Sequence, residues 1–448
     1  MSENGIRNAR ELGTPKVLLL GFQHMFAMFG ATVLVPALTG LSVSATLLFA
    51  GLGTLLFHLL TKRRVPAFLG SSFAFLGGYF AVADLIKGSG TGANWIPYAG
   101  LGVMCAGLLY VLLSALFRAF GAGKVMRYFP PIVTGPIIIC IGITLANSAI
   151  DNCITNWWIA LLAIVIVIVC NIWGKGMIKI VPILLGVVGS YAVAALCGQL
   201  DPEKIQALKD AAWIGLPFQW KDTVFSLIGT ADAGLLGSAL AMMLPIALAT
   251  IVEHIGDMCA ISSTVGDNYV ANPGLHRSLL GDGTATALAA MFGAPANTTY
   301  GENTGVLALT KVYDPMVIRL AAVFAIIFSF CPKFAALISC MPAATIGGVS
   351  LILYGMISAV GVRNVVENQV DFTKSRNVII AALIMSLALG INFSSVGGII
   401  FTIGSVTIKL SGLAVAAIVG ILVNAILPGN DYTFPNNEQG DKSVHFKV

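Results

Sequence analysis

The sequence predicts an all-α polytopic membrane protein with about fourteen transmembrane segments. Of its 448 residues, 57% are hydrophobic before its 49 glycines are counted, and 10% are charged. Soluble domains carry about 25% charged residues, so this chain has too little polar surface to coat a soluble body. Apolar runs of spanning length also recur from end to end. These observations exclude a soluble enzyme, a disordered chain and a nucleic-acid-binding domain.

The expected transmembrane segments follow from the apolar runs. A bilayer core about 30 Å thick requires about 20 residues of helix. We expect segments near 17–36, 43–60, 66–85, 96–117, 127–148, 157–173, 180–198, 235–255, 279–294, 299–312, 316–340, 344–361, 377–392 and 410–428.

Two of these segments are interrupted by residues that disfavour a continuous helix. The third contains PAFLGSSFAFLGG at 66–78, and the tenth contains PANTTYGENTGV at 295–306. They are seven segments apart, and because seven is odd, a second seven-segment unit would cross the membrane in the opposite direction. Broken segments at matching positions of two inverted repeats are typical of transporters with a binding site near the bilayer midplane.

The basic residues predict the topology. They cluster in alternate loops, which the positive-inside rule assigns to the cytoplasm: Arg7, Arg10 and Lys16, then Lys62, Arg63 and Arg64, then Arg118, Lys124 and Arg127, then Lys175 and Lys179, and finally Arg363, Lys374 and Arg376. We therefore expect a multi-pass protein of the cell membrane, embedded in lipid, with both termini cytoplasmic. The eight cysteines are scattered through apolar runs without a CxxC pair, and no HExxH motif occurs. We expect no metal and no cofactor.

Several ionisable residues fall inside apolar segments, where a charge costs roughly 2.5–3.5 kcal/mol on insertion scales. In the eighth segment Glu253 and Asp257 are four residues apart, on one helical face. In the tenth, Glu302 and Asn303 lie in the Gly-flanked break. A purely structural role is hard to reconcile with both glutamates, because each would need a buried partner.

Other polar residues of the segments allow two interpretations. His24, beside Gln23 in the first segment, and His254 in the eighth are either structural histidines or parts of a site. Asp257 is either functional or a solvated residue near the cytoplasmic end of its helix. Asp282, at the start of the ninth segment, is either a supporting residue or a helix N-cap.

The two breaks predict the chemistry of the site. Interrupted helices free backbone N–H and C=O groups at membrane depth, which is tolerated only in protein or beside a cavity. Backbone donors next to carboxylate acceptors suit a small planar solute that carries both N–H and C=O groups, and Phe73 and Tyr300 supply flat walls. We expect a transporter. A channel or anion exchanger of similar fold is the alternative, and a membrane enzyme has no nucleophile–base pair or metal motif to support it.

These residues resemble the nucleobase–ascorbate transporter family, and most closely its uracil–proton symporter branch. The family signature is Gln, Glu or Pro, then Asn, any residue, Gly, four residues, Thr, and a basic residue or Gly. In this chain it reads ENTG at 302–305 followed by Thr310 and Lys311. The Gln23-His24 pair in QHMFAMFGATVLVP, the pattern VPAFLGSSFAF and the loop NPGLHRS are also similar to that branch. The resemblance extends from about residue 14 to 428.

The resemblance implies fourteen segments in two inverted seven-segment repeats, with short antiparallel strands in segments 3 and 10. It also implies a core domain that moves against a gate domain held in a homodimer. The implied division is a cytoplasmic tail 1–16, core 17–117, gate 118–222, core 223–340, gate 341–428 and a cytoplasmic tail 429–448.

The resemblance further implies roles for individual residues and the transport of uracil with a proton. The implied uracil ligands are the carboxylates of Glu253 and Glu302 and the backbone amides of Phe73 and Gly301, with Ala31 and Tyr300 along the ring and with Gln23, His24, Asn303 and Asp282 in support. Asp257 occupies the position where the uracil branch tends to have a proton-coupling His, so Asp257 and Glu253 are the expected proton-coupling residues, and Asp282 is more like the purine branch. A purine (xanthine or urate) symporter and sodium coupling therefore remain alternatives.

Overall fold

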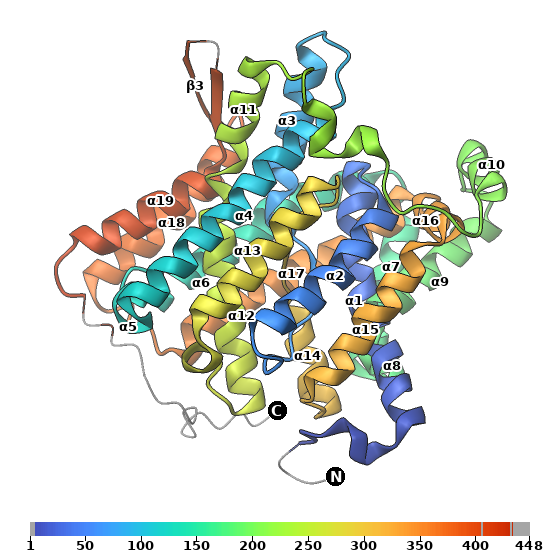
Figure 1. Ribbon diagram of the computed structural model, residues 1–448, viewed down its shortest axis with the longest axis horizontal. Helices are drawn as coiled ribbons and strands as arrows, with labels where there is room; N and C mark the ends of the chain where they lie inside the picture. The colour runs from blue at the N-terminus through green and yellow to red at the C-terminus, as the bar shows by residue number, and fades with distance from the viewer. Residues whose placement is uncertain (1–4, 405, 431, 433–448) are drawn as a thin grey trace.

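The computed structural model confirms a helical, polytopic membrane fold (Figure 1). It describes residues 5–404, 406–430 and 432, except the side chains at 27, 122, 180, 301–303, 305 and 309. Within these residues, seven helices are long and apolar enough to cross a membrane, or eight if one bent pair counts as a span. The remaining expected segments correspond to shorter or interrupted helices, so not every segment is a continuous span.

The helices coincide closely with the expected segments. In the first half they are α1 (Thr14–Thr39), α2 (Val43–Leu60), α3 (Leu76–Gly88), α4 (Trp95–Phe120), α5 (Ala122–Met126), α6 (Pro131–Ile154), α7 (Trp157–Ile172), α8 (Met177–Ile180), α9 (Pro182–Leu196) and α10 (Pro202–Asp210). In the second half they are α11 (Ala233–Met243), α12 (Ile246–Val265), α13 (Leu275–Met291), α14 (Gly301–Thr310), α15 (Pro315–Ser329), α16 (Pro332–Ser339), α17 (Ala343–Glu367), α18 (Ser375–Asn392) and α19 (Gly412–Ile426). Short turns of helix are η1 (Ala9–Leu12), η2 (Phe73–Phe75), η3 (Trp220–Asp222), η4 (Val224–Leu227) and η5 (Val270–Gly274).

Both interrupted segments contain a three-residue strand, as the resemblance implies. Strand β1 (Leu69–Ser71) pairs antiparallel with β2 (Asn297–Thr299), and Gly70 lies opposite Thr298. The hydroxyl of Thr54 donates to the carbonyl oxygen of Leu69 at 3.4 Å and accepts from its N–H at 2.9 Å. Strand pairing and side-chain hydrogen bonds thus satisfy backbone groups that a helix would otherwise satisfy internally.

The eighth, ninth and eleventh segments differ from their expected forms. The eighth is two helices, α11 and α12, which meet at Pro245 because proline removes a helical hydrogen bond. The ninth begins at Leu275 rather than 279. The eleventh bends by 89° between α15 and α16, directly before Pro332.

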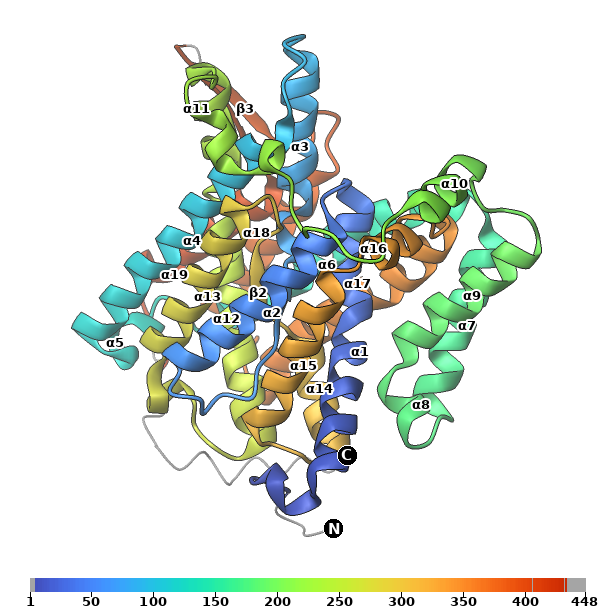
Figure 2. The same cartoon turned by 45° about the vertical axis from the view of Figure 1, so that its right-hand side comes forward.

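A second strand pair was not expected. Strands β3 (Ile399–Ile403) and β4 (Val406–Leu410) form an antiparallel hairpin between α18 and α19. The hairpin projects from one end of the helical bundle, beside α11, whereas α7, α8 and α9 stand together at another edge (Figure 2). The fold is therefore mostly, but not entirely, helical.

Glycines allow the central helices to approach one another closely. A Cβ atom at Gly142 of α6 would lie 2.1 Å from the carbonyl oxygen of Tyr354 in α17. A Cβ atom at Gly107 of α4 would lie 2.6 Å from the carbonyl oxygen of Gly283 in α13. Small residues at such contacts are typical of helix packing in membranes.

Candidate substrate-binding site

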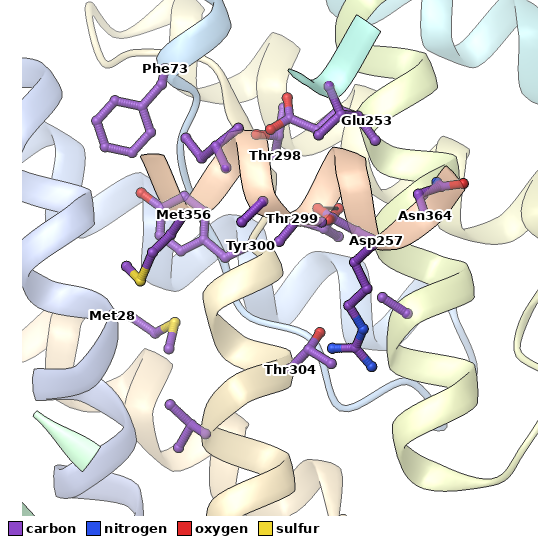
Figure 3. A pocket seen from close by; sticks show the side chains of 18 of the residues that line it. Met28, Phe73, Glu253, Asp257, Thr298, Thr299, Tyr300, Thr304, Met356 and Asn364 are labelled. Atoms are coloured by element: carbon purple, nitrogen blue, oxygen red, sulfur yellow. Dashed lines mark hydrogen bonds between the residues drawn. The ribbon is translucent and has the colours of Figure 1, made fainter. Parts of the chain in front are cut away.

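A cavity of about 520 Å³ lies where the two strands meet α12 and α17 (Figure 3). The strand ends and the helices α1, α6, α7, α9, α12 and α17 all contribute residues to its wall. Residues on its wall include Met28, Ser72, Phe73, Ile138, Glu253, Asp257, Thr298, Thr299, Tyr300, Thr304, Met356 and Asn364.

Two aromatic residues that closely follow the strands line the cavity: Phe73 lies two residues after β1, and Tyr300 lies directly after β2. The Tyr300 hydroxyl donates to the carbonyl oxygen of Ser71 at 3.1 Å and lies 3.2 Å from the Ser71 hydroxyl. The ring of Phe73 packs against that of Tyr354, with centroids 5.6 Å apart and planes at 78°. Figure 3 shows Phe73 and Tyr300 on one side of the cavity and the α12 carboxylates on the other. The two rings are thus held in place by contacts outside the cavity.

Glu253 and Asp257 both line the cavity from successive turns of α12. Glu253 is half-buried, whereas Asp257 is only 3% exposed. The Thr299 hydroxyl donates to Oδ2 of Asp257 at 3.1 Å. The interpretation of Asp257 as a solvated residue at a helix end is therefore wrong, because α12 continues to Val265 and encloses it.

The family-signature residues begin α14. Tyr300 precedes the helix without a side-chain cap, so the first N–H groups of α14 start at the cavity wall. A helix N-terminus offers backbone donors that lack partners in the helix. The side chains of Gly301, Glu302 and Asn303 lie outside the described part of the structure, and their expected roles stay predictions.

The expected supporting residues of α1, Gln23 and His24, are not on the cavity wall. Gln23 and His24 are buried, and neither ring nitrogen of His24 has a hydrogen-bond partner among the described residues. Ala31 is buried with its carbonyl oxygen 3.5 Å from the Ser71 hydroxyl, and Met28 is the α1 residue on the cavity wall.

Asp282 and His254 meet beneath the strands. Since α13 begins at Leu275, Asp282 lies inside the helix and is completely buried, so its interpretation as an N-cap is wrong. Its Oδ2 lies 2.5 Å from Nδ1 of His254. The same nitrogen lies 3.1 Å from the Thr299 hydroxyl, and Nε2 lies 3.0 Å from the Ser278 hydroxyl.

The cavity also has polar residues that the sequence analysis did not single out. Thr298 and Thr299 come from the tenth-segment break, and their place inside that break, just before the signature residues, was the signal available. A second group lies at the end of α17, which extends to Glu367 instead of ending near 361. The α17 group comprises Arg363, Asn364, Glu367 and Asn368.

Comparison with known proteins identifies the family of the chain. Residues 15–397 match the model of a permease family. The chain is 41% identical over 439 residues to the uracil permease of Bacillus caldolyticus, which covers 96% of both chains. It is 39% identical to the uracil permease of Bacillus subtilis over 98% of both chains, and 36% identical to that of Escherichia coli K12 over 91% of this chain and 90% of the other.

Solved structures of similar fold belong to other transporters. The transmembrane domain of the cyanobacterial bicarbonate transporter BicA has a TM-score of 0.59 at 17% identity, covering 94% of this chain and 99% of that one. SLC26A9 has a TM-score of 0.62 at 11% identity, covering 94% and 66%. These likenesses concern the fold. The sequence matches extend over nearly the whole chain and confirm the resemblance found in its motifs: the chain belongs to the permease family, whose members are transporters rather than enzymes.

Proposed function

We propose that this chain imports uracil across the cell membrane in symport with a proton. The observation that carries the proposal is a cavity with a carboxylate wall facing two aromatic rings, in a chain whose relatives over nine-tenths or more of both lengths are uracil permeases. Relatives with this coverage share the whole transport unit, so their substrate is the first to test.

The proposed pose matches the hydrogen-bonding groups of uracil. The carboxylates of Glu253 and Glu302 accept from its N–H groups, and the backbone amides of Phe73 and Gly301 donate to its carbonyl oxygens. The pyrimidine ring lies against Phe73 and Tyr300. Every polar edge of the solute then has a partner, which matters because an unpaired buried donor or acceptor costs about 1–3 kcal/mol.

A proton is the proposed coupling ion. Asp257 is buried and one helical turn from Glu253. Two carboxyl groups this close in a low-dielectric site do not both ionise easily, so one of them retains a proton. In the proposed division of labour Glu253 binds the substrate, and Asp257 takes up and releases the proton.

Transport is proposed to occur by alternating access. The cavity has walls from the proposed core, 17–117 with 223–340, and from the proposed gate, 118–222 with 341–428, so movement of one against the other would open it in turn to each side. Lys179, Arg363 and Glu367 lie at its charged end, and the first two belong to the cytoplasmic loops expected from sequence. We also propose that both termini are cytoplasmic and that the protein lies in the cytoplasmic (inner) membrane. Its segments would form two inverted repeats, and its gate domain would associate with that of a second copy in a homodimer.

Two alternatives rest on particular observations. Asp282 is more like the purine branch, and Asp257 stands where the uracil branch tends to have a His, so a xanthine or urate symporter, or sodium coupling, stays under test. The fold neighbours include a bicarbonate transporter, but carboxylates on the wall disfavour an anion as the solute.

Uptake of radiolabelled uracil into proteoliposomes tests the proposal. We expect accumulation to follow an inward proton gradient, to be insensitive to a sodium gradient, and to be blocked by unlabelled uracil but not by xanthine or bicarbonate. The Asp257→Asn variant should lose accumulation and retain uracil exchange, since its binding acceptors remain. Accumulation driven only by sodium, or inhibition by xanthine in preference to uracil, would contradict the assignment.

A further inference from the structure

A row of four polar side chains extends from the cavity into the protein interior. Asp257 lines the cavity and accepts from the Thr299 hydroxyl at 3.1 Å. The Thr299 oxygen lies 3.1 Å from Nδ1 of His254, and this nitrogen lies 2.5 Å from Oδ2 of Asp282. Hydrogen-bonding distances therefore connect a cavity carboxyl group to a second carboxyl group that is completely buried.

The inner end of the row is shielded from the cavity. The side chains of His254 and Asp282 are 0% exposed, and neither is on the cavity wall. Phe57 of α2 and Tyr110 of α4 flank the imidazole, each with its centroid 6.5 Å away. The carboxyl groups that act electrostatically on Tyr110, beside the imidazole, are Asp282 and, from α12, Glu253 and Asp257. A proton on Asp282 would thus be separated from cavity water by β2 and the imidazole.

The hydrogen-bond partners of His254 fix which nitrogen carries hydrogen. The Ser278 hydroxyl lies 3.0 Å from Nε2 and 3.2 Å from the carbonyl oxygen of Leu275. It has a single hydrogen, which it donates to the carbonyl oxygen of Leu275, so we assign the imidazole hydrogen to Nε2, which donates it to the Ser278 hydroxyl. Nδ1 is then the unprotonated nitrogen of the neutral ring, within reach of both Asp282 and Thr299, because the partner of one ring nitrogen sets the tautomer of the other.

We propose that Asp282 is a second, occluded proton acceptor of this transporter, reached from Asp257 through the Thr299 hydroxyl and the His254 imidazole. Its role in transport rests on the proposed symport, whereas proton binding by Asp282 can be measured without substrate. The row would let the coupling proton leave the cavity wall while the cavity is open to water.

The transfer balances at each atom. Protonated Asp257 gives its proton to Oγ1 of Thr299, and the original hydroxyl proton of Thr299 passes to Nδ1 of His254. The same proton then passes from Nδ1 to Oδ2 of Asp282, so the ring is an imidazolium only between these two transfers. Thr299 and His254 end in their starting forms, Asp257 becomes a carboxylate and Asp282 becomes a carboxylic acid. The reverse sequence returns the proton to the cavity.

Thr299 provides the sharpest test, because it joins the two halves of the row. Thr299→Val has nearly the same shape but no hydroxyl, and Thr299→Ser keeps the hydroxyl as the matched control. Calorimetric titration with uracil in two buffers of different ionisation enthalpy gives the protons taken up per uracil bound. We expect Thr299→Val to lose most of this proton uptake and most of its proton-driven accumulation of uracil. Its Kd for uracil should change by about tenfold or less, because that is the effect of losing one hydrogen bond. Thr299→Ser should behave like the wild type.

Two results would overturn the relay: wild-type proton uptake in Thr299→Val, or equal losses in the Val and Ser variants, which would indicate a packing role.

Infrared spectroscopy of protonated carboxyl groups, in protein without uracil, is the independent measurement. Asp282→Asn should remove a titrating carboxyl band that Asp257→Asn leaves in place, and absence of that band also overturns the proposal. If the wild type does not bind uracil, the proposed function fails, and the infrared titration still decides on Asp282.

Discussion

The two interrupted segments share a backbone plan but differ in chemistry. The first arm, residues 66–88, and the second arm, residues 295–310, each begin with proline and form a three-residue strand. Each continues through an aromatic residue of the cavity wall, Phe73 or Tyr300, into a short helix. The pairing of β1 with β2 joins the arms at the centre of the protein.

The difference lies in where their polar side chains are directed. In the first arm, the Ser71 hydroxyl donates to the carbonyl oxygen of Thr32 in α1 at 2.8 Å, a contact within the scaffold. In the second arm, Thr299 donates to Asp257 and contacts His254. One arm therefore shapes the site, and the other connects to its ionisable groups. Equivalent backbone positions thus need not carry equivalent functions.

Gly70→Ala should produce the largest effect on stability and uracil binding. The first arm can shape the site only if its strand packs closely against the second arm. A Cβ atom at Gly70 would lie 2.4 Å from Cε2 of Tyr300 and 2.6 Å from its hydroxyl oxygen. Forcing extra volume into a packed core costs about 1–3 kcal/mol, and the displaced Tyr300 is also the residue before α14. We expect lower thermal stability and no measurable uracil binding.

Gly77→Ala is the matched control for that experiment. It lies in the same arm, at the start of α3, and a Cβ atom there would meet nothing within 4 Å. Alanine in a helix is favoured over glycine by roughly 0.5–1 kcal/mol, so this variant should be as stable as the wild type or more so. Equal stability and binding in both variants would refute close packing of the arms.

Glu302→Gln should have the next largest effect and tests the chemistry assigned to the second arm. An amide at this position cannot accept from a uracil N–H in the same way, and an unpaired buried donor costs about 1–3 kcal/mol, or about 5–150-fold in affinity. Glutamine is the residue usual in the purine branch, so we also expect xanthine binding to appear or strengthen. Calorimetric titration with both bases measures the change. Unaltered uracil affinity would remove Glu302 from the site.

Much of the fold could be predicted because bilayer crossing leaves long apolar runs. The two breaks were visible in the sequence, and the four-residue spacing placed Glu253 and Asp257 on one face of α12. The resemblance added the strand pairing, which no local pattern in PAFLGSS or PANTTYG specifies. In contrast, the β3–β4 hairpin is rich in β-branched residues along IIFTI and VTIKL, a strand signal that hydropathy alone obscures.

The depth of the polar residues could not be predicted from hydropathy. Polar residues near the end of an apolar run look like the start of a loop, so Asp257 resembled a solvated helix end. The structure extends α12 through eight further residues and covers Asp257 with Thr299 from a segment more than forty residues away. Such long-range contacts also bring Asp282 to His254, and they depend on tertiary packing that sequence periodicity does not encode.

Ser71→Ala should have the smallest effect and confine it to stability. Proline at position 36 has no N–H, so the carbonyl oxygen of Thr32 lacks its usual partner within α1, and the Ser71 hydroxyl supplies one at 2.8 Å. Removing that hydroxyl leaves a buried acceptor unpaired, at a cost of about 1–3 kcal/mol. The Tyr300 hydroxyl still donates to the backbone of residue 71, so uracil affinity and proton uptake should stay at wild-type values.

A double-mutant cycle with Pro36→Ala identifies the cause of that loss. Alanine at position 36 restores an N–H for the Thr32 carbonyl, so Ser71→Ala should cost less in this background than in the wild type, since residues that share a partner are not additive. Thermal unfolding of the four proteins gives the coupling. Equal costs in both backgrounds would show that Ser71 does not compensate for Pro36. A change in proton uptake on Ser71→Ala would instead mean that the first arm, like the second, takes part in coupling, and the contrast between the arms would fail.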